Sequence, residues 1–349
     1  MNPIVTLVML IAMVLGTTIT MMSSHWLLAW IGLEMNTLAM LPLMSKKHHP
    51  RAVEASTKYF LVQATASTIL LSASMTNAWF MGQWDILQMT HPIPASMLTL
   101  ALALKIGIAP LHTWLPDVLQ GLDLTTGLIL STWQKLAPFA LLLQIYPVNS
   151  YLLITLGVAS TLVGGWGGLN QTQLRKILAY SSIAHLGWMI TILQFAPSLT
   201  LLALTTYLIM TTSAFLSLTL YKATNINMLA TSWTKSPVLS TMIPLILLSL
   251  AGLPPLLGFM PKWLILQELT KQGLLTIAVL IALTALLTLF FYLRLSFALA
   301  LTMSPNMVSN MQSWRLPHNK HTLPLAVTTS LTALLLPLTP TIKTVLGLL

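Results

Sequence analysis

Five ionisable side chains lie within stretches of sequence that are otherwise apolar: Glu34, Lys105, Lys135, His185 and Lys262. A charge at the centre of a membrane costs about 2.5–3.5 kcal/mol on insertion scales, so few such residues are kept without a partner or a use. Carboxylates, amines and imidazoles all accept and release protons. A lysine whose acid partner moves away can lose its proton and regain it when the partner returns. These residue types therefore predict proton transfer within a membrane.

Each of these residues also has a structural interpretation. Glu34 and Lys105 could form a static pair that locks two helices together, whereas no second intramembrane acid is left to pair with Lys135. His185 is the weakest candidate, because a lone histidine hydrogen-bonded to a hydroxyl, such as that of Ser181, is at least as typical of packing as of proton transfer. The hypothesis that Glu34 acts on Lys105 fails if Glu34→Gln leaves proton pumping untouched.

Lys105 precedes a point where its apolar segment, residues 95–120, should be broken. Pro110 removes a helical hydrogen bond and clashes with the preceding turn. Backbone groups freed in lipid must be satisfied by protein or water. We therefore expect a membrane helix interrupted near Pro110, with water inside the protein at the break. His112 follows directly and could reach freed carbonyls or a water chain, which makes it a candidate for the proton path.

The same spacing of residues recurs later in the chain. Gly107-x-x-Pro110-Leu111-x-x-Trp114-x-Pro116 matches Gly252-x-x-Pro255-Leu256-x-x-Phe259-x-Pro261. The second copy predicts another broken helix, residues 237–270, interrupted at Pro254 and Pro255. Paired broken helices in inverted repeats indicate the ion path of a transporter.

The sequence predicts an all-α polytopic membrane protein. A transmembrane helix needs about 20 apolar residues. On that measure there are about eleven spans: 4–22, 25–44, 56–79, 95–120, 125–146, 150–169, 174–193, 198–221, 237–270, 274–301 and 322–345. Each copy of the repeated motif lies in the fourth span of a block of five spans. Because the first block has an odd number of spans, the second block crosses the membrane in the opposite orientation. The blocks cover residues 1–148 and 149–303, and a loop and final helix occupy residues 304–349.

Composition supports a membrane protein and excludes several other classes. Charged residues make up 6% of the 349 residues, against about 25% in soluble domains, and hydrophobic residues make up 56%. The net charge of +10 comes from scattered Lys and Arg without a nucleic-acid reader motif, so no nucleic-acid partner is expected. The absence of cysteine excludes disulfides and thiolate metal sites. No phosphate-loop, dinucleotide or zinc motif is present, so we expect no cofactor and no metal in this chain.

Positive charge is concentrated in the loops after even-numbered spans. These loops hold Lys46, Lys47, Arg51, Arg175, Lys176, Lys222, Lys235, Arg315 and Lys320. The positive-inside rule places these loops and the N-terminus on the inner side and the C-terminus on the outer side. Among the peripheral groups, Glu54 and Lys58 form a predicted i,i+4 surface pair, and Arg294 should reach toward the inner membrane face. The glycine cluster at residues 164–168 should mark a helix end.

Three motifs resemble one membrane-protein family: the segment from Lys105 to Asp117 around Pro110, the segment from His25 to Asn36, and Leu174-Arg175-Lys176-x-Leu178-Ala179-Tyr180-Ser181-Ser182-Ile183-Ala184-His185. They resemble the antiporter-like membrane subunits of respiratory NADH:ubiquinone oxidoreductase (complex I), particularly the animal mitochondrial members. The resemblance covers the whole chain. It implies a proton-translocating membrane-arm subunit, made inside the organelle, in which Glu34, Lys105, Lys135 and Lys262 form the proton path.

The resemblance also implies a setting for the chain. NAD, FMN, iron–sulfur clusters and ubiquinone are expected in other subunits, with no redox chemistry in this chain. The multi-pass protein is expected in the mitochondrial inner membrane, with its N-terminus on the matrix side and its C-terminus on the intermembrane-space side. Family members typically have about fourteen spans, so three N-terminal helices are missing here. A neighbouring subunit or lipid must cover the face left behind, and we expect the chain not to be stable alone.

Two alternative functions remain open. A subunit of a multi-subunit cation/proton antiporter would share the broken helices and the lysines, but would have no redox partner. A purely structural membrane-arm subunit would hold its buried charges static. The surplus of buried lysines over buried acids argues against the structural alternative.

Overall fold

The computed structural model describes residues 3–46, 49–145, 150–234, 237–300 and 322–345. The chain forms two compact units, Met1–Ala159 and Ser160–Leu349. Their division falls within a helix and not at the predicted block boundary after residue 148, and the three predicted blocks stay predictions. Four loop residues used to predict sidedness lie outside the described residues: Lys47, Lys235, Arg315 and Lys320.

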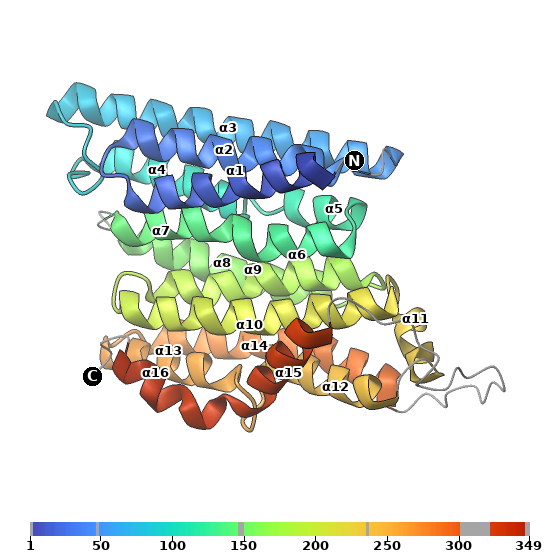
Figure 1. Ribbon diagram of the computed structural model, residues 1–349. Helices are drawn as coiled ribbons and strands as arrows, with labels where there is room; N and C mark the ends of the chain where they lie inside the picture. The colour runs from blue at the N-terminus through green and yellow to red at the C-terminus, as the bar shows by residue number, and fades with distance from the viewer. Residues whose placement is uncertain (1–2, 47–48, 146–149, 235–236, 301–321, 346–349) are drawn as a thin grey trace. The chain divides into compact units, whose positions relative to one another are not determined.

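The first unit consists of helices that pack side by side. Its elements are α1 (Pro3–Met22), α2 (Trp26–Met44), α3 (Pro50–Met81), α4 (Pro92–Ile106), α5 (Trp114–Gly121), α6 (Leu124–Thr132), η1 (Trp133–Lys135), α7 (Leu136–Gln144) and the start of α8 (Ser150–Gly168). Helices α1, α2 and α3 run next to one another, and α3 also packs on α4 and α5 (Figure 1). A Cβ atom on Gly16 of α1 or Gly32 of α2 would lie 2.8 Å from the carbonyl oxygen of the other glycine. Small residues thus allow the close approach that drives helix packing in membranes.

The second unit is arranged around α10. Its elements are α9 (Leu174–Ile192), α10 (Pro197–Tyr221), α11 (Ile226–Ala230), η2 (Thr231–Thr234), α12 (Pro237–Ala251), α13 (Phe259–Lys271), α14 (Leu275–Ala300), α15 (Thr322–Leu334), η4 (Leu336–Leu338) and α16 (Thr339–Val345). Helix α10 packs on α9, α12, α13 and α15, and α14 packs on α12 and α13. The predicted glycine cluster forms the last turn of α8, where a Cβ on Gly164 would lie 2.6 Å from the backbone nitrogen of Ala184 in α9.

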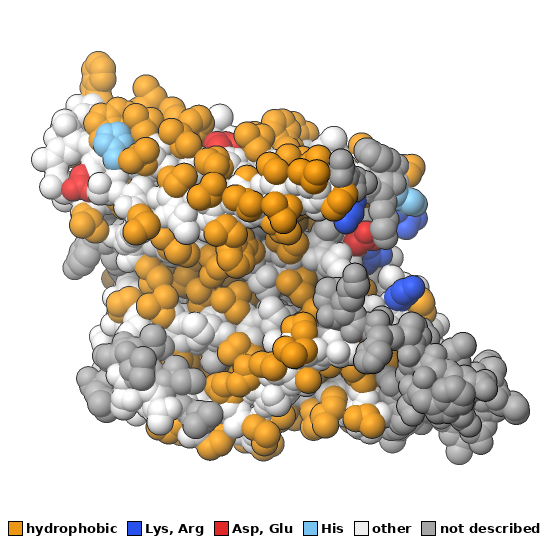
Figure 2. All heavy atoms as spheres, viewed as in Figure 1, with side chains coloured by type: hydrophobic (Ala, Val, Ile, Leu, Met, Phe, Trp, Pro, Cys, Tyr) orange, Lys and Arg blue, Asp and Glu red, His pale blue; other side chains and the backbone are white. Residues whose placement is uncertain are grey.

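Five helices in the described part of the chain are long and apolar enough to cross a membrane: Pro3–Met22, Trp26–Met44, Tyr151–Gly168, Pro197–Tyr221 and Leu275–Ala300. The prediction of a mostly helical membrane protein is therefore confirmed. Hydrophobic side chains cover much of the face drawn in Figure 2. The other predicted spans are more polar, as in α3 and α9, or are interrupted, so the count of eleven stays a prediction.

The two glycines of the repeated motif end their helices in the same way. Gly107 after α4 has φ +86°, and Gly252 after α12 has φ +85°. The N–H groups of Gly107 and Ile108 both donate to Ala103 O at 2.9 Å. The second copy repeats this pair of bonds to Leu248 O, at 3.1 and 3.3 Å. Glycine is favoured at such helix ends because it has no Cβ to clash in the left-handed region.

Side chains satisfy the carbonyls that the first break leaves without helical partners. The indole N–H of Trp114, at the start of α5, donates to Leu104 O at 3.1 Å. The Gln63 amide of α3 donates to Lys105 O at 3.3 Å. Both acceptors belong to the last turn of α4, whose helical pattern stops at residue 107. The break is thus held by donors from α5, which follows it in the chain, and from α3, which packs on α4.

Two further predicted spans are interrupted where the sequence analysis expected continuous helices. The span 125–146 is divided by η1, and the span 322–345 is divided by η4. Pro138 and Pro337 explain these corrections, because a proline lacks the N–H that would bond the carbonyl four residues earlier and its ring crowds that carbonyl. The 3₁₀ turn η1 ends three residues before Pro138, and Pro337 lies inside η4.

Gly107→Ala should destabilise the protein more than Gly82→Ala. Both glycines have positive φ, +86° and +71°, so alanine is strained at either position, by about 1–2 kcal/mol. A Cβ at residue 107 would also lie 2.8 Å from Leu115 Cδ1, whereas nothing lies within 4 Å at residue 82. The fraction of protein that stays folded in native membranes after a heat step measures the difference. Equal losses would mean that Leu115 moves aside without cost.

Trp114→Phe should lower the thermal stability, because Leu104 O then has no donor in a buried site. An unsatisfied buried group costs about 1–3 kcal/mol. Trp79→Phe is the matched control, since the Trp79 side chain is 87% exposed. The same heat step on native membranes compares the two variants. Similar stabilities for both would contradict a holding role for the Trp114 indole.

Candidate functional site

Two of the predicted lysines border one buried cavity in the first unit. Lys105 lies in the last turn of α4 and is 5% exposed, and Lys135 ends η1 and is 3% exposed. The cavity offers about 20 Å³ to the centre of a water-sized sphere, which is enough for one water molecule. Besides the lysines, the polar residues of its lining are Asn36, Thr37, Tyr59, Gln63, Trp114 and Gln134. The sequence analysis named only the lysines of this set.

Polar groups in this lining are buried without protein partners. Lys105 Nζ has no hydrogen-bond partner among the described residues, and the same holds for the side-chain amide of Asn36. Buried polar groups are nearly always hydrogen-bonded to protein or water. A water molecule in the cavity would give Lys105 an acceptor. The arrangement therefore suits a hydrated cation site.

The wall of the cavity next to Lys135 is fixed by Gln134. Its amide donates to Asn36 O of α2 at 3.3 Å and contacts Met13 Sδ of α1 at 3.4 Å. These bonds hold η1 against α1 and α2. Because Gln134 precedes Lys135 directly, they also hold the backbone that carries the lysine beside the cavity.

Glu34 does not touch Lys105 directly. No ion pair within 4.0 Å joins them in the described structure, although Glu34 is close enough for its charge to act on Lys105 and Tyr59. The Glu34 carboxylate instead accepts a hydrogen bond from Thr37 Oγ1, with 3.1 Å between Oγ1 and Oε2. Any effect of Glu34 on Lys105 must therefore act through space or through intervening groups.

Lys262 is held at the second break. Its Nζ donates to Ala251 O, the last carbonyl of α12, at 2.7 Å, and lies 5.9 Å from the centre of the Trp188 ring. A cation is favoured at a helix C-terminus, where the carbonyl ends carry partial negative charge. Lys262 and Trp188 also border a small cavity of about 10 Å³.

His185 borders the same cavity as Lys262 within the second unit. It lies on α9, half-buried, and its ring centre is 5.7 Å from that of Tyr207 in α10, at a tilted angle. The sequence could not have placed His185 next to Lys262, because the two are far apart along the chain. Tyr207, which is fully buried, was not singled out from the sequence.

His112 lies in the first break but not in the lining of the cavity. It is half-buried, and its Nδ1 is 3.3 Å from Pro110 O. Pro110, Pro254 and Pro255 are exposed on the surface of the isolated chain. The breaks thus present their prolines outward, while their lysines face inward.

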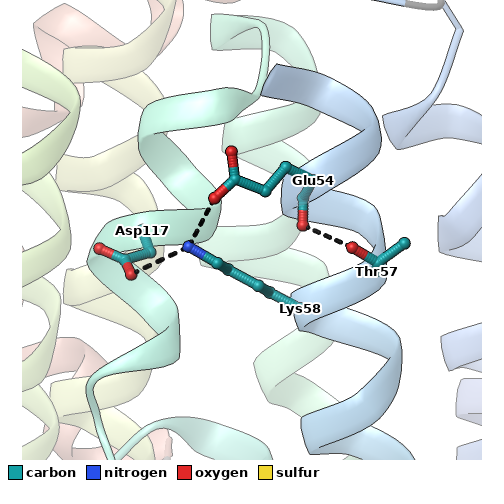
Figure 3. A network of polar contacts seen from close by, with 4 residues as sticks. All are labelled: Glu54, Thr57, Lys58 and Asp117. Carbon is teal, nitrogen blue, oxygen red and sulfur yellow. Dashed lines mark hydrogen bonds and ion pairs between the residues drawn. The ribbon is translucent and has the colours of Figure 1, made fainter. Parts of the chain in front are cut away.

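An ion-pair network lies outside both cavities, on the surface of the first unit. Lys58 Nζ is 2.8 Å from Glu54 Oε1, which confirms the predicted surface pair, and 3.5 Å from Asp117 Oδ2 of α5 (Figure 3). Thr57 Oγ1 donates to Glu54 O at 2.9 Å. The hydrogen bond from Lys58, and then its charge, hold the pKa of the Glu54 carboxyl below its usual value. The network joins α3 to α5, a contact that the sequence analysis did not predict.

Arg294 binds backbone carbonyls at the end of α8 and in the loop that follows it. The expectation that it reaches toward the inner membrane face stays a prediction. The guanidinium donates to Leu169 O at 2.7 Å and to Gln171 O. A cation that binds the free carbonyls after a helix satisfies acceptors that would otherwise lack donors.

Among the described residues, no group of three or more His, Cys, Asp or Glu could hold a metal ion.

Comparisons with known proteins agree along the whole chain. The model for the NADH:quinone oxidoreductase/Mrp antiporter membrane region matches residues 23–288, and the model for the NADH dehydrogenase subunit 2 C-terminus matches residues 289–343. NADH-ubiquinone oxidoreductase chain 2 of Tetraodon nigroviridis is 66% identical over 348 residues, covering 100% of both chains.

Solved structures share this fold. A chain of respiratory complex I from Thermus thermophilus, with bound aureothin, matches with a TM-score of 0.85 and 28% identity over 97% of this chain and 79% of that chain. A chain of the Mrp complex from Dietzia sp. DQ12-45-1b matches with a TM-score of 0.82 and 18% identity, over 94% of this chain and 74% of that chain, which shows a shared fold alone. From its sequence matches, the chain belongs to the NADH-ubiquinone oxidoreductase chain 2 family, within the wider NADH:quinone oxidoreductase/Mrp antiporter family.

Proposed function

We propose that the chain is a proton-translocating subunit of the membrane arm of respiratory NADH:ubiquinone oxidoreductase, driven by quinone reduction in other subunits. The observation that carries this proposal is the pair of lysines, Lys105 and Lys135, on one buried polar cavity. Intramembrane cations on a cavity that admits water are typical of ion and proton paths. Family membership supports the setting in a respiratory complex.

In the first unit, Glu34 and Lys105 act as a modulated pair and Lys135 relays the proton. A change of charge on Glu34 alters the energy of the Lys105 ammonium, because opposite charges attract strongly in a low-dielectric interior. When Lys105 gives up its proton, Lys135 lies on the same cavity to receive it through water. Each transfer leaves one lysine neutral and the other charged, so the cavity never holds more charge than before.

In the second unit, Lys262 is the exit or hand-over residue, and His185 is its candidate partner. Both residues border one cavity. The hydrogen bond from Lys262 Nζ to Ala251 O stabilises the ammonium form of Lys262. His112 is a further candidate where the first break meets the surface. The proposed sequence of proton carriers is Lys105, Lys135, His185 and Lys262.

The proposed membrane arrangement has eleven spans in two inverted five-helix repeats, followed by a final helix. It is supported by the matching backbone at Gly107 and Gly252, since two copies of one break are expected from a repeat. The N-terminus lies on the matrix side and the C-terminus on the intermembrane-space side of the mitochondrial inner membrane. Loop charges support this orientation through the positive-inside rule.

The proposed partners are other membrane-arm subunits and lipid, without nucleic acid. Helix α1 supports this, because its exposed apolar side chains include Ile4, Leu7, Val8 and Ile11. Such a face needs lipid or another helix against it. We place NAD, FMN, the iron–sulfur clusters and ubiquinone in other subunits and leave this chain without a cofactor or metal.

Two other functions compete with this one. The likeness in fold to a chain of the Mrp complex favours a subunit of a cation/proton antiporter, but only at the level of fold. A structural subunit with static charges would need a partner for each buried charge, whereas Lys105 Nζ has none among the described residues. Co-purification of the chain with redox-active subunits excludes the antiporter alternative.

Lys135→Met should lower electron transfer and proton translocation together in the assembled complex. Methionine keeps the length and removes the proton-binding group from the cavity. Loss of a positioned acid or base typically lowers a rate by about 10²–10⁴-fold, and we expect a loss of at least about tenfold. NADH:ubiquinone activity and proton uptake in sealed vesicles measure the two rates, normalised to the amount of assembled complex.

Lys46→Met is the matched control, because Lys46 is an exposed loop lysine. It should leave both rates unchanged. If the Lys135→Met complex assembles and retains both rates at full stoichiometry, the buried charges are structural and the proposed function fails.

A further inference from the structure

The Glu34 carboxylate has one side-chain donor within the described structure. Thr37 Oγ1 lies 3.1 Å from Glu34 Oε2 and 2.9 Å from Glu34 O. Most threonines in the described helices bond only a carbonyl three or four residues earlier, as Thr20 does at 2.8 Å. Thr37 differs because its hydroxyl also reaches a carboxylate that belongs to the proposed proton path.

Thr37 also borders the cavity that holds the two lysines, whereas Glu34 does not. The Thr37 side chain is buried, with 6% exposed, so its hydroxyl is shielded from outside solvent. Lys105, which borders the same cavity, has an Nζ that lacks a hydrogen-bond partner among the described residues. Glu34 and Lys105 form no ion pair within 4.0 Å in this part of the structure. Thr37 therefore bonds the acid and borders the cavity on which the base lies, although the acid and the base form no ion pair.

We propose that Thr37 is a proton-relay residue that connects the Glu34 carboxyl to the water and the lysines of the cavity. A hydroxyl suits this role because it accepts one hydrogen bond while it donates another. The inference rests on the proposed function and adds to it a proton transfer between the two members of the modulated pair, Glu34 and Lys105.

The transfer balances without any further reactant. The O–H bond of protonated Glu34 breaks and its proton binds Thr37 Oγ1, while the original Thr37 hydrogen passes to the cavity water. The water passes one of its own hydrogens to the neutral amine of Lys105. The products are a carboxylate at Glu34 and an ammonium at Lys105, with Thr37 and the water unchanged. The reverse transfer runs through the same atoms.

The matched substitutions at Thr37 separate the hydroxyl from the shape of the side chain. Thr37→Val keeps the shape and removes the hydroxyl, and Thr37→Ser keeps the hydroxyl and removes a methyl group. Thr20→Val is the control, because Thr20 is a fully buried helix threonine whose hydroxyl donates to Thr17 O and which does not line the cavity. All variants are assayed in the assembled complex in sealed vesicles.

Thr37→Val should lower coupled electron transfer and proton translocation by about tenfold or more, against a typical contribution of about 10²–10⁴-fold for a positioned proton-transfer group. Thr37→Ser and Thr20→Val should stay close to the unsubstituted complex. Equal rates in the Thr37→Val and Thr37→Ser complexes would overturn the relay, as would a loss in Thr20→Val as large as that in Thr37→Val.

Thr37→Ala keeps the test decisive if the valine variant does not assemble. Alanine and serine are both smaller than threonine, so neither overpacks the helix, and only serine keeps the hydroxyl. The serine complex should be faster, and equal rates would overturn the relay. If Thr37→Val leaves both rates unchanged while Lys135→Met lowers them strongly, the Thr37 relay is wrong and the proposed function stands. If Lys135→Met leaves both rates unchanged, the proposed function itself is wrong.

Discussion

A backbone carbonyl inside a membrane must find a hydrogen-bond donor, and this requirement governs the interruptions of the helices. At the end of α4 the donors are the neutral side chains of Trp114 and Gln63. At the end of α12 one donor is the charged side chain of Lys262. These side chains also border the cavities of their units. The side chains that stabilise the breaks therefore also contribute polar groups to the lining of the neighbouring cavities.

The sequence predicts a helix break well only when the residue that ends the helix is visible. The left-handed turns at Gly107 and Gly252 follow from a glycine and a proline at fixed spacing. Proline alone is a weaker signal, because Pro244 lies inside the continuous helix α12 while Pro138 follows a 3₁₀ turn. A proline inside a helix leaves one carbonyl without its helical donor, and the surroundings of that carbonyl decide whether the helix continues. That information lies in tertiary contacts, which hydropathy and spacing do not contain.

The candidate ionisable residues could be selected from the sequence, but the contacts that they make could not. Depth in an apolar segment was enough to select Glu34, Lys105 and Lys135. Depth could not show that Glu34 forms no ion pair with Lys105 in the described structure. It also could not show that Lys105 and Lys135 border one cavity. Neutral groups such as Thr37 and Gln134 carry no such signal, because threonine and glutamine are tolerated at many places in membrane helices. They become recognisable only when a distance places them beside a charge.

The three lysines of the proposed path all lie at the ends of helical segments. Lys105 is in the last turn of α4, Lys135 ends η1, and Lys262 is in the first turn of α13. A cation is favoured at a helix C-terminus and disfavoured at an N-terminus. Lys105 has the favourable end of its own helix. Lys262 lies at the N-terminus of α13, where a positive charge is disfavoured. Its side chain reaches across the break to the C-terminal carbonyl of α12. A proton on Lys262 is therefore stabilised by a helix other than its own, and any movement of α13 relative to α12 would change the energy of that proton.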